Sequence, residues 1–151
     1  MTYKLVVFDV SGTLRNGEGR LFDGLSDVLR QLHQQGVQLA VASSLSVGGI
    51  RRFLDDNGIE GLFCCIKSAD QTEPKPHPAM LKQILLETAI EPHETIMIGD
   101  SPEDILMAKA AGIASIAALW RDGAEVHQFI DLRPDFVLQL VSELLNTLQQ
   151  K

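Results

Sequence analysis

The stretch KLVVFDVSGTL, residues 4–14, joins a continuous apolar run to an aspartate, Asp9, and then to a turn that contains glycine. Apolar runs without alternation are typical of a strand that is buried on both faces, as in a parallel sheet. In such sheets, ligands bind beyond the carboxyl ends of the strands. Asp9 therefore stands where this kind of sheet places its binding site.

Four further apolar runs alternate with helical patterns along the rest of the chain. We expect strands at residues 3–10, 37–43, 62–67, 95–98 and 114–118, and helices at 25–35, 47–57, after Pro78, 102–111 and 137–148. Strands that alternate with helices of this length form right-handed β-α-β units. The sequence predicts a single α/β domain over residues 1–151, with a doubly wound, mostly parallel five-stranded sheet and helices on both of its faces.

Composition and charge exclude several classes of protein. The net charge is −7 and no stretch concentrates Lys and Arg, which argues against nucleic acid as the main partner. No apolar run approaches the length of a membrane span, and the N-terminus lacks the layout of a signal peptide, so we expect a cytoplasmic protein without a membrane partner. Cys64 and Cys65 are adjacent in an apolar run and have neither zinc-ligand nor redox spacing.

Polar residues stand at the ends of the expected strands. They are Asp9, the pair Ser43 and Ser44, Lys75 after a longer loop, and Asp100. Two carboxylates ~4 Å apart near a protein surface repel each other by about 4 kcal/mol, and a hard cation such as Mg²⁺ cancels that cost. Lysine, serine hydroxyls and the backbone N–H groups of a glycine turn can hold phosphate oxygens. The set predicts a magnesium-assisted phosphate site, with Asp9 placed as a nucleophile.

Each of these residues also has an ordinary structural explanation. An Asp-x-x-Gly-Thr turn is usually only a capped turn, and Ser43 and Ser44 suit a turn or the cap of the next helix. Lys75 lies in a proline-rich loop, where lysines are most often solvated, and Ser101 suits a helix cap. Taken singly, these explanations are the more common ones. The combination, in order along the chain and always at a strand end, favours the site.

Four motifs in this order resemble the haloacid dehalogenase-like (HAD) superfamily, and particularly its phosphoglycolate phosphatase-like branch. The motifs are Asp9-Val10-Ser11-Gly12-Thr13, Ser43 after a strand, Lys75-Pro76-His77-Pro78 and Gly99-Asp100-Ser101-Pro102-Glu103-Asp104. The resemblance covers nearly the whole chain. It implies a Rossmann-like core and a Mg²⁺-dependent phosphohydrolase that works through an aspartyl-phosphate on Asp9.

The resemblance also implies roles for individual residues. The implied catalytic residues are Asp9, Ser11, Ser43 and Lys75. The implied substrate-binding residues are Gly12, Thr13, Ser43, Ser44 and Lys75. The implied metal ligands are Asp9, the backbone carbonyl of Ser11, Asp100 and Asp104. For Asp104 two roles stay open, since it would support either the metal or Lys75.

Ser11 is the first departure from the superfamily's pattern. The phosphatase branch usually has a second aspartate there, which protonates the leaving alcohol and then helps to activate water. A serine hydroxyl has no pKa near neutrality, and general acid–base catalysis is typically worth about 10²–10⁴-fold. We therefore expect attenuated activity, slow on alkyl phosphates and faster on aryl or acyl phosphates. The superfamily's P-type ATPases carry threonine in this position, and their aspartyl-phosphate is long-lived.

The second departure is the absence of the cap domain that the branch inserts between its first two motifs. Residues 15–23 leave room only for a short flap, in which Arg15 and Asn16 are the candidates for substrate contact. Caps select small substrates and exclude water, so the site is expected to be open. An open site suits a large phosphorylated partner, a homodimer that covers it, or a protein with low selectivity. The expected partner is a phosphorylated small molecule or a phosphorylated macromolecule.

Two functions remain in competition. The first is a HAD-like hydrolase, a phosphatase of the phosphoric monoester class. The second is a catalytically degenerate HAD protein that binds phosphate or a partner, a reading motivated by Ser11 and the absent cap. Retention of the nucleophile, the lysine and the acidic residues in one chain favours the enzyme, since a binding role need not keep Asp9.

Overall fold

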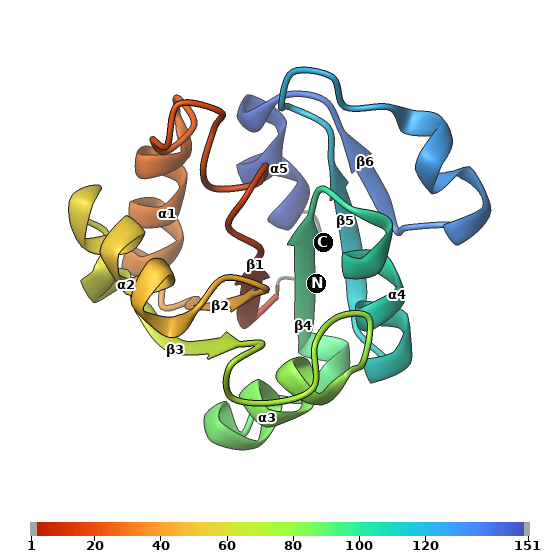
Figure 1. The fold of residues 1–151 in the computed structure, drawn as a ribbon, viewed down its shortest axis with the longest axis horizontal. Coiled ribbons are helices and arrows are strands. Elements are labelled where there is room, and N and C mark those ends of the chain that lie inside the picture. The colour runs from red at the N-terminus through yellow and green to blue at the C-terminus, as the bar shows by residue number, and fades with distance from the viewer. Residues whose placement is uncertain (1–2, 150–151) are drawn as a thin grey trace.

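Six parallel strands form one sheet in the order β3-β2-β1-β4-β5-β6 in the computed structural model of the chain, which describes residues 3–149 (Figure 1). The strands are β1 (Leu5–Phe8), β2 (Gln38–Ser43), β3 (Phe63–Ser68), β4 (Thr95–Gly99), β5 (Ala114–Ala118) and β6 (Phe136–Leu138). The α-helices are α1 (Leu25–Gln34), α2 (Val47–Asp56), α3 (Ala79–Thr88), α4 (Pro102–Ala111) and α5 (Leu144–Leu148). The strand order reverses at β1, which is where such sheets bind ligands.

The two faces of the sheet are covered by different helices, as Figure 1 shows. In β1, Val6 and Phe8 pack into a cluster with residues of α1, α2 and α5. Leu5 and Val7, on the opposite face, pack with residues of α3 and α4. Successive strand residues point to opposite faces, so a strand covered on both sides has to be apolar throughout. The predicted doubly wound α/β architecture is confirmed.

The C-terminal part of the chain corrects the predicted number of strands. The sequence predicted five strands and a helix at 137–148, whereas residues 136–138 form a sixth strand and α5 spans only Leu144–Leu148. The side chain of Asp135 accepts a hydrogen bond from the Ser115 backbone N–H at 2.8 Å, which holds the segment against β5. Val137 therefore belongs to β6 and not to the apolar stripe of a helix.

A tight loop and a short flap join β1 to α1. The backbone carbonyl of Val10 accepts hydrogen bonds from the N–H groups of Thr13, Leu14 and Arg15. The Asn16 side chain then accepts from the N–H groups of Glu18 and Arg20 at 2.9 and 3.0 Å. Within residues 3–149, nothing larger than this flap lies between β1 and α1, as the sequence predicted.

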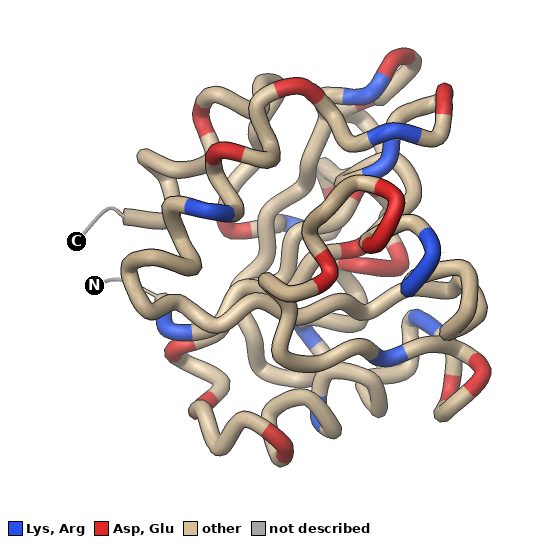
Figure 2. Tube along the Cα trace, turned by 90° about the vertical axis from the view of Figure 1, so that its left-hand side faces the viewer, with Lys and Arg blue, Asp and Glu red and all other residues tan. Residues whose placement is uncertain are grey.

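Charged residues are spread along the trace, and Lys and Arg form no continuous strip in the view of Figure 2. None of the helices in the described part of the chain has the length and apolar character needed to cross a membrane.

Candidate active site

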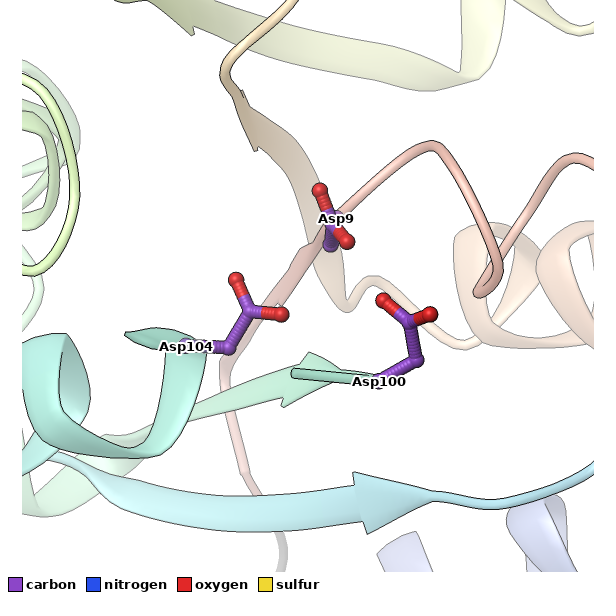
Figure 3. Close-up of side chains that lie close together, drawn as sticks. All are labelled: Asp9, Asp100 and Asp104. Atoms are coloured by element: carbon purple, nitrogen blue, oxygen red, sulfur yellow. The ribbon is translucent and has the colours of Figure 1, made fainter. Parts of the chain in front are cut away.

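Three aspartates converge at the carboxyl edge of the sheet (Figure 3). Asp9 follows β1, Asp100 follows β4, and Asp104 lies in the first turn of α4. One carboxylate oxygen from each lies within 4.8 Å of the others. Since β1 and β4 are paired in parallel, with Phe8 opposite Ile98, both strands deliver their aspartates to the same place.

Lys75 lies between two of these carboxylates. Its Nζ is 2.8 Å from Asp9 Oδ1 and 2.6 Å from Asp104 Oδ1, and only 5% of its side chain is exposed. Burial opposes the positive charge, but the two carboxylates outweigh that effect and raise the pKa of Lys75. The structure therefore places Lys75 in a buried ion-pair network and not in solvent.

Burial has the largest effect on the pKa values of the three aspartates. It raises the pKa of Asp9 to about 6 and that of Asp104 to about 6, although Lys75 favours the charged form of both. Burial also raises the pKa of Asp100, and the Arg121 guanidinium opposes this shift with Nε 2.9 Å from Asp100 Oδ2. Lys75 and Arg121 bring two positive charges to three clustered carboxylates, so the cluster favours either a proton or an added cation.

The contacts of Asp104 distinguish between its two expected roles. Oδ1 faces Lys75, while Oδ2 accepts hydrogen bonds from the backbone N–H of Ser101 at 3.2 Å and from its hydroxyl at 3.0 Å. Both oxygens are engaged, and the residue is fully buried. This geometry favours the role that orients Lys75, and it leaves Asp9 and Asp100 as the better candidates for metal ligands.

Ser43 is the last residue of β2, at the carboxyl edge of the sheet, and only 1% of its surface is exposed. Its Oγ accepts a hydrogen bond from the Leu45 N–H at 3.1 Å, which fixes the hydroxyl at the strand end. The cap of α2 is Ser46, which accepts from the Gly49 N–H, so Ser43 is not needed for that role. Ser44 is exposed.

The N–H groups of the glycine turn, among them the expected phosphate donors, differ in whether they already have an acceptor. The Gly12 N–H donates to the Arg15 carbonyl and the Thr13 N–H donates to the Val10 carbonyl, so both have a backbone partner. The Thr13 side chain is also fully buried. Among the described residues, no acceptor engages the N–H groups of Val10 and Ser11, which makes them the better donors. The sequence could not separate these from the other N–H groups, because the hydrogen-bond pattern depends on the turn.

Gly12 allows the turn to approach Asp100 closely. Its φ is +81°, and a Cβ at this position would lie 1.9 Å from Asp100 Oδ2. No other residue type combines this backbone conformation with such a contact. Gly12 therefore allows the turn to lie directly against Asp100.

An open cleft of about 1240 Å³ lies beside the aspartates. Asp100, Ser11 and the flap residues Arg15 and Asn16 line it, together with the loop that contains Trp120 and Arg121. Trp120 Nε1 donates to the Thr13 carbonyl at 2.9 Å and so ties this loop to the turn after β1. The sequence suggested that residues 120–123 border the site but assigned them no role, because this contact spans more than a hundred residues of chain.

A family model for haloacid dehalogenase-like hydrolases matches residues 7–118, which include Asp9, Ser43, Lys75, Asp100 and Asp104 but not the loop at 120–123. The chain belongs to this family. The resemblance that the four motifs indicated is thereby confirmed, and with it the assignment to the HAD hydrolases.

Two similar curated proteins are named as a pyrophosphatase and a phosphatase. A pyrophosphatase PpaX of Anoxybacillus flavithermus is 29% identical over 84% of this chain and 59% of its own length. A phosphoglycolate phosphatase of Vibrio vulnificus is 32% identical over 83% of this chain and 55% of its own length. This chain thus spans little more than half the length of these curated relatives.

Solved HAD structures show the same fold. A predicted phosphoglycolate phosphatase from Haemophilus somnus superposes with a TM-score of 0.87 at 18% identity and covers 99% of both chains. CbbY from Rhodobacter sphaeroides, in complex with phosphate, gives a TM-score of 0.81 at 18% identity, over 95% of this chain and 96% of its own. At this identity the likeness concerns the fold, and the chemistry has to come from the site.

Proposed function

We propose that this HAD-family chain is a Mg²⁺-dependent phosphohydrolase that forms an aspartyl-phosphate on Asp9. The observation that carries the proposal is the buried ion pair of Asp9 and Lys75, with a carboxylate oxygen of Asp9 within 4.8 Å of one of Asp100, which lines an open cleft. A buried carboxylate oriented by a lysine, with a second carboxylate beside it, is a costly arrangement that a phosphate-transfer site explains. The names of its relatives, pyrophosphatase and phosphoglycolate phosphatase, agree with phosphate chemistry.

The donor set fits a hard divalent cation. Asp9 and Asp100 would hold it, with the Ser11 carbonyl as a third ligand by family resemblance, while Asp104 keeps its contacts to Lys75 and Ser101. Mg²⁺ accepts a few carboxylate or carbonyl oxygens and leaves its other positions to water and phosphate. When bound, it supplies the positive charge that a phosphate needs to approach two carboxylates.

Lys75 and Asp9 have different roles in the first step, the transfer of the phosphoryl group to Asp9. Lys75 Nζ, 2.8 Å from Asp9 Oδ1, holds the nucleophile and carries a charge that attracts phosphate. The other oxygen of Asp9 forms a bond to phosphorus while the bond from phosphorus to the leaving oxygen breaks, and that oxygen keeps the electron pair. Water then attacks phosphorus while the bond between phosphorus and the Asp9 oxygen breaks, a proton of the water passes to solvent or stays on the phosphate, and phosphate and the Asp9 carboxylate are released.

Ser11 determines which leaving groups suit this site. It has no proton to give near neutral pH, so the leaving oxygen departs as an anion. Aryl and acyl phosphates yield stable anions, whereas alkyl phosphates do not. We therefore propose phosphorylated small molecules or macromolecules with acidic leaving groups as the substrates.

The test of this function compares p-nitrophenyl phosphate and acetyl phosphate with an alkyl phosphate such as glycerol phosphate, each with Mg²⁺ and with EDTA. We expect turnover of the first two only with Mg²⁺, and alkyl turnover slower by about 10²-fold or more. Equal rates on all three substrates would contradict the role given to Ser11. A folded protein without turnover on any of them would favour the degenerate, phosphate-binding alternative.

Restoring an acid at position 11 is expected to increase alkyl phosphatase activity. In Ser11→Asp, kcat/KM for glycerol phosphate should rise about tenfold, at the low end of general acid catalysis, because Arg15 would pair with the new carboxylate and hold its pKa down. Ser142→Asp is the matched control, since Ser142 is exposed and lines the same cleft. A gain in the control, or none at position 11, would show that the acid is not what limits the rate.

Mg²⁺ is expected to bind about tenfold more tightly at about pH 7.5 than at about pH 5. Burial raises the pKa of Asp9 to about 6, so at the lower pH the metal has to displace a proton from this carboxylate. Titration calorimetry at the two pH values, in buffers of different ionisation enthalpy, measures both the affinity and the proton release. Equal affinities at both pH values would remove Asp9 from the metal site.

A further inference from the structure

Arg15 occupies the place from which the family's missing acid would act. Its Nη2 donates a hydrogen bond to Ser11 Oγ at 2.5 Å, and both side chains line the cleft beside Asp100. By family resemblance, position 11 is where the leaving oxygen normally receives its proton. The guanidinium therefore lies in direct contact with the side chain at the position that this resemblance assigns to the acid.

The backbone fixes Arg15 in this position from both sides. Its N–H donates to the Val10 carbonyl at 2.8 Å, and its carbonyl accepts from the Gly12 N–H at 2.9 Å. Arg15 also forms isolated β-bridges to Ser11 and to Leu21, which anchor the base of the flap. The side chain consequently starts from a rigid turn and not from a mobile loop.

The charge of Arg15 is not neutralised by a neighbouring carboxylate. Arg121 pairs with Asp100 and Arg20 pairs with Glu18, whereas no carboxylate within residues 3–149 lies within ion-pair distance of Arg15. Its observed side-chain partner is a neutral hydroxyl. An unpaired guanidinium at an open cleft is available to an anionic group of a ligand.

We propose that Arg15 is a catalytic residue that stabilises the negative charge on the leaving oxygen. This inference rests on the phosphohydrolase function proposed above. A guanidinium stays protonated in proteins, so Arg15 donates a hydrogen bond and transfers no proton. The oxygen leaves with the electron pair of its bond to phosphorus, and solvent protonates it after release. Positive charge aimed at the atom where charge develops replaces part of what the missing acid supplied.

This role predicts a dependence on the leaving group that a structural role does not produce. The more basic the leaving oxygen, the more negative charge it carries in the transition state and the more it gains from Arg15. Arg15→Gln is expected to lower kcat/KM for phenyl phosphate by about 30-fold, and for the more acidic leaving group of p-nitrophenyl phosphate by about threefold. The two substrates have nearly the same shape, so the ratio of the two losses reports charge and not fit.

Two further variants complete the experiment. Arg20→Gln makes the same change at an exposed flap residue that does not line the cleft, and both of its rates should stay within about twofold of wild type. Arg15→Lys keeps the charge but loses the planar fork, and its phenyl phosphate rate should lie between wild type and Arg15→Gln. If Arg15→Gln does not fold, the ratio of losses in Arg15→Lys decides in its place.

The outcomes separate this inference from the function on which it rests. A larger loss on phenyl phosphate than on p-nitrophenyl phosphate supports it. Equal losses of kcat/KM on both substrates, or no loss on either, would overturn the role of Arg15. The proposed function would still stand if the wild type showed Mg²⁺-dependent turnover. A wild type that hydrolyses neither substrate would overturn both.

Discussion

The Lys75→Met variant is expected to have a free energy of unfolding about 3–5 kcal/mol lower than the wild type, measured without metal near pH 7.5. The substitution leaves Asp9 and Asp104 buried without their shared cation, which now lies 2.8 and 2.6 Å from them. Methionine fills a similar volume, so the loss reports electrostatics more than packing. Urea denaturation in EDTA measures it.

Lys67→Met is the matched control for this variant. Lys67 pairs with Glu87, whose side chain is 52% exposed, so breaking that pair should cost no more than about 1 kcal/mol. Near pH 5 the effect of Lys75→Met should shrink, because the folded pKa values of Asp9 and Asp104 lie above the ordinary value of 3.8. A carboxyl group whose pKa is raised in the folded state stabilises the fold at low pH. This contribution to the free energy of unfolding is lost as pH rises from about 4 through about 6. Equal losses in the two variants, or a larger loss near pH 5, would contradict a buried network at Lys75.

The Asp9→Asn variant is expected to lose at least about 10⁴-fold in kcat/KM for p-nitrophenyl phosphate. The amide has no anionic oxygen to attack phosphorus, and it is a weaker metal ligand than the carboxylate. The fold should persist, since Lys75 keeps its contact to Asp104. Steady-state kinetics with excess Mg²⁺ measure the loss, and the thermal unfolding midpoint verifies that the variant is folded.

Asp23→Asn provides the comparison for Asp9→Asn. Asp23 is an exposed carboxylate that lines the cleft beside Asp100, so the substitution removes the same charge without touching the aspartate cluster. Its rate should stay within about threefold of wild type. Activity of Asp9→Asn close to that of Asp23→Asn would mean that water or another side chain is the nucleophile.

The sequence located most of the candidate site because parallel strands end at one edge of a sheet. Asp9, Ser43 and Asp100 each follow an apolar run, and the structure brings them to that edge. Lys75 lies in a loop with no periodicity of its own, and only the order of the four motifs indicated that it belongs with Asp9. In the structure Lys75 forms ion pairs with Asp9 and Asp104, so residues from three of the four motifs are in direct contact.

Features that depend on long-range contacts could not be predicted. β6 has three residues, too few for a strand pattern, and it is held in place by the side chain of Asp135. The contact between Arg121 and Asp100 and that between Trp120 and Thr13 join segments far apart in the chain. The hydrogen-bond pattern of the glycine turn could not be predicted for a local reason, since it depends on the turn's own geometry, in which the N–H groups of Gly12 and Thr13 have acceptors and those of Val10 and Ser11 have none among the described residues.

The central claim is that Asp9 carries the phosphoryl group, and the most direct test is to trap it. The protein would be mixed with acetyl phosphate and Mg²⁺, quenched with acid within seconds and digested for mass spectrometry. Because Ser11 cannot act as a base for the hydrolytic water, we expect the intermediate to accumulate, with one phosphoryl group on the peptide that contains Asp9. The adduct should be absent with EDTA and in Asp9→Asn. Mg²⁺-dependent turnover that persists in Asp9→Asn, with no adduct on any aspartate, would contradict the account.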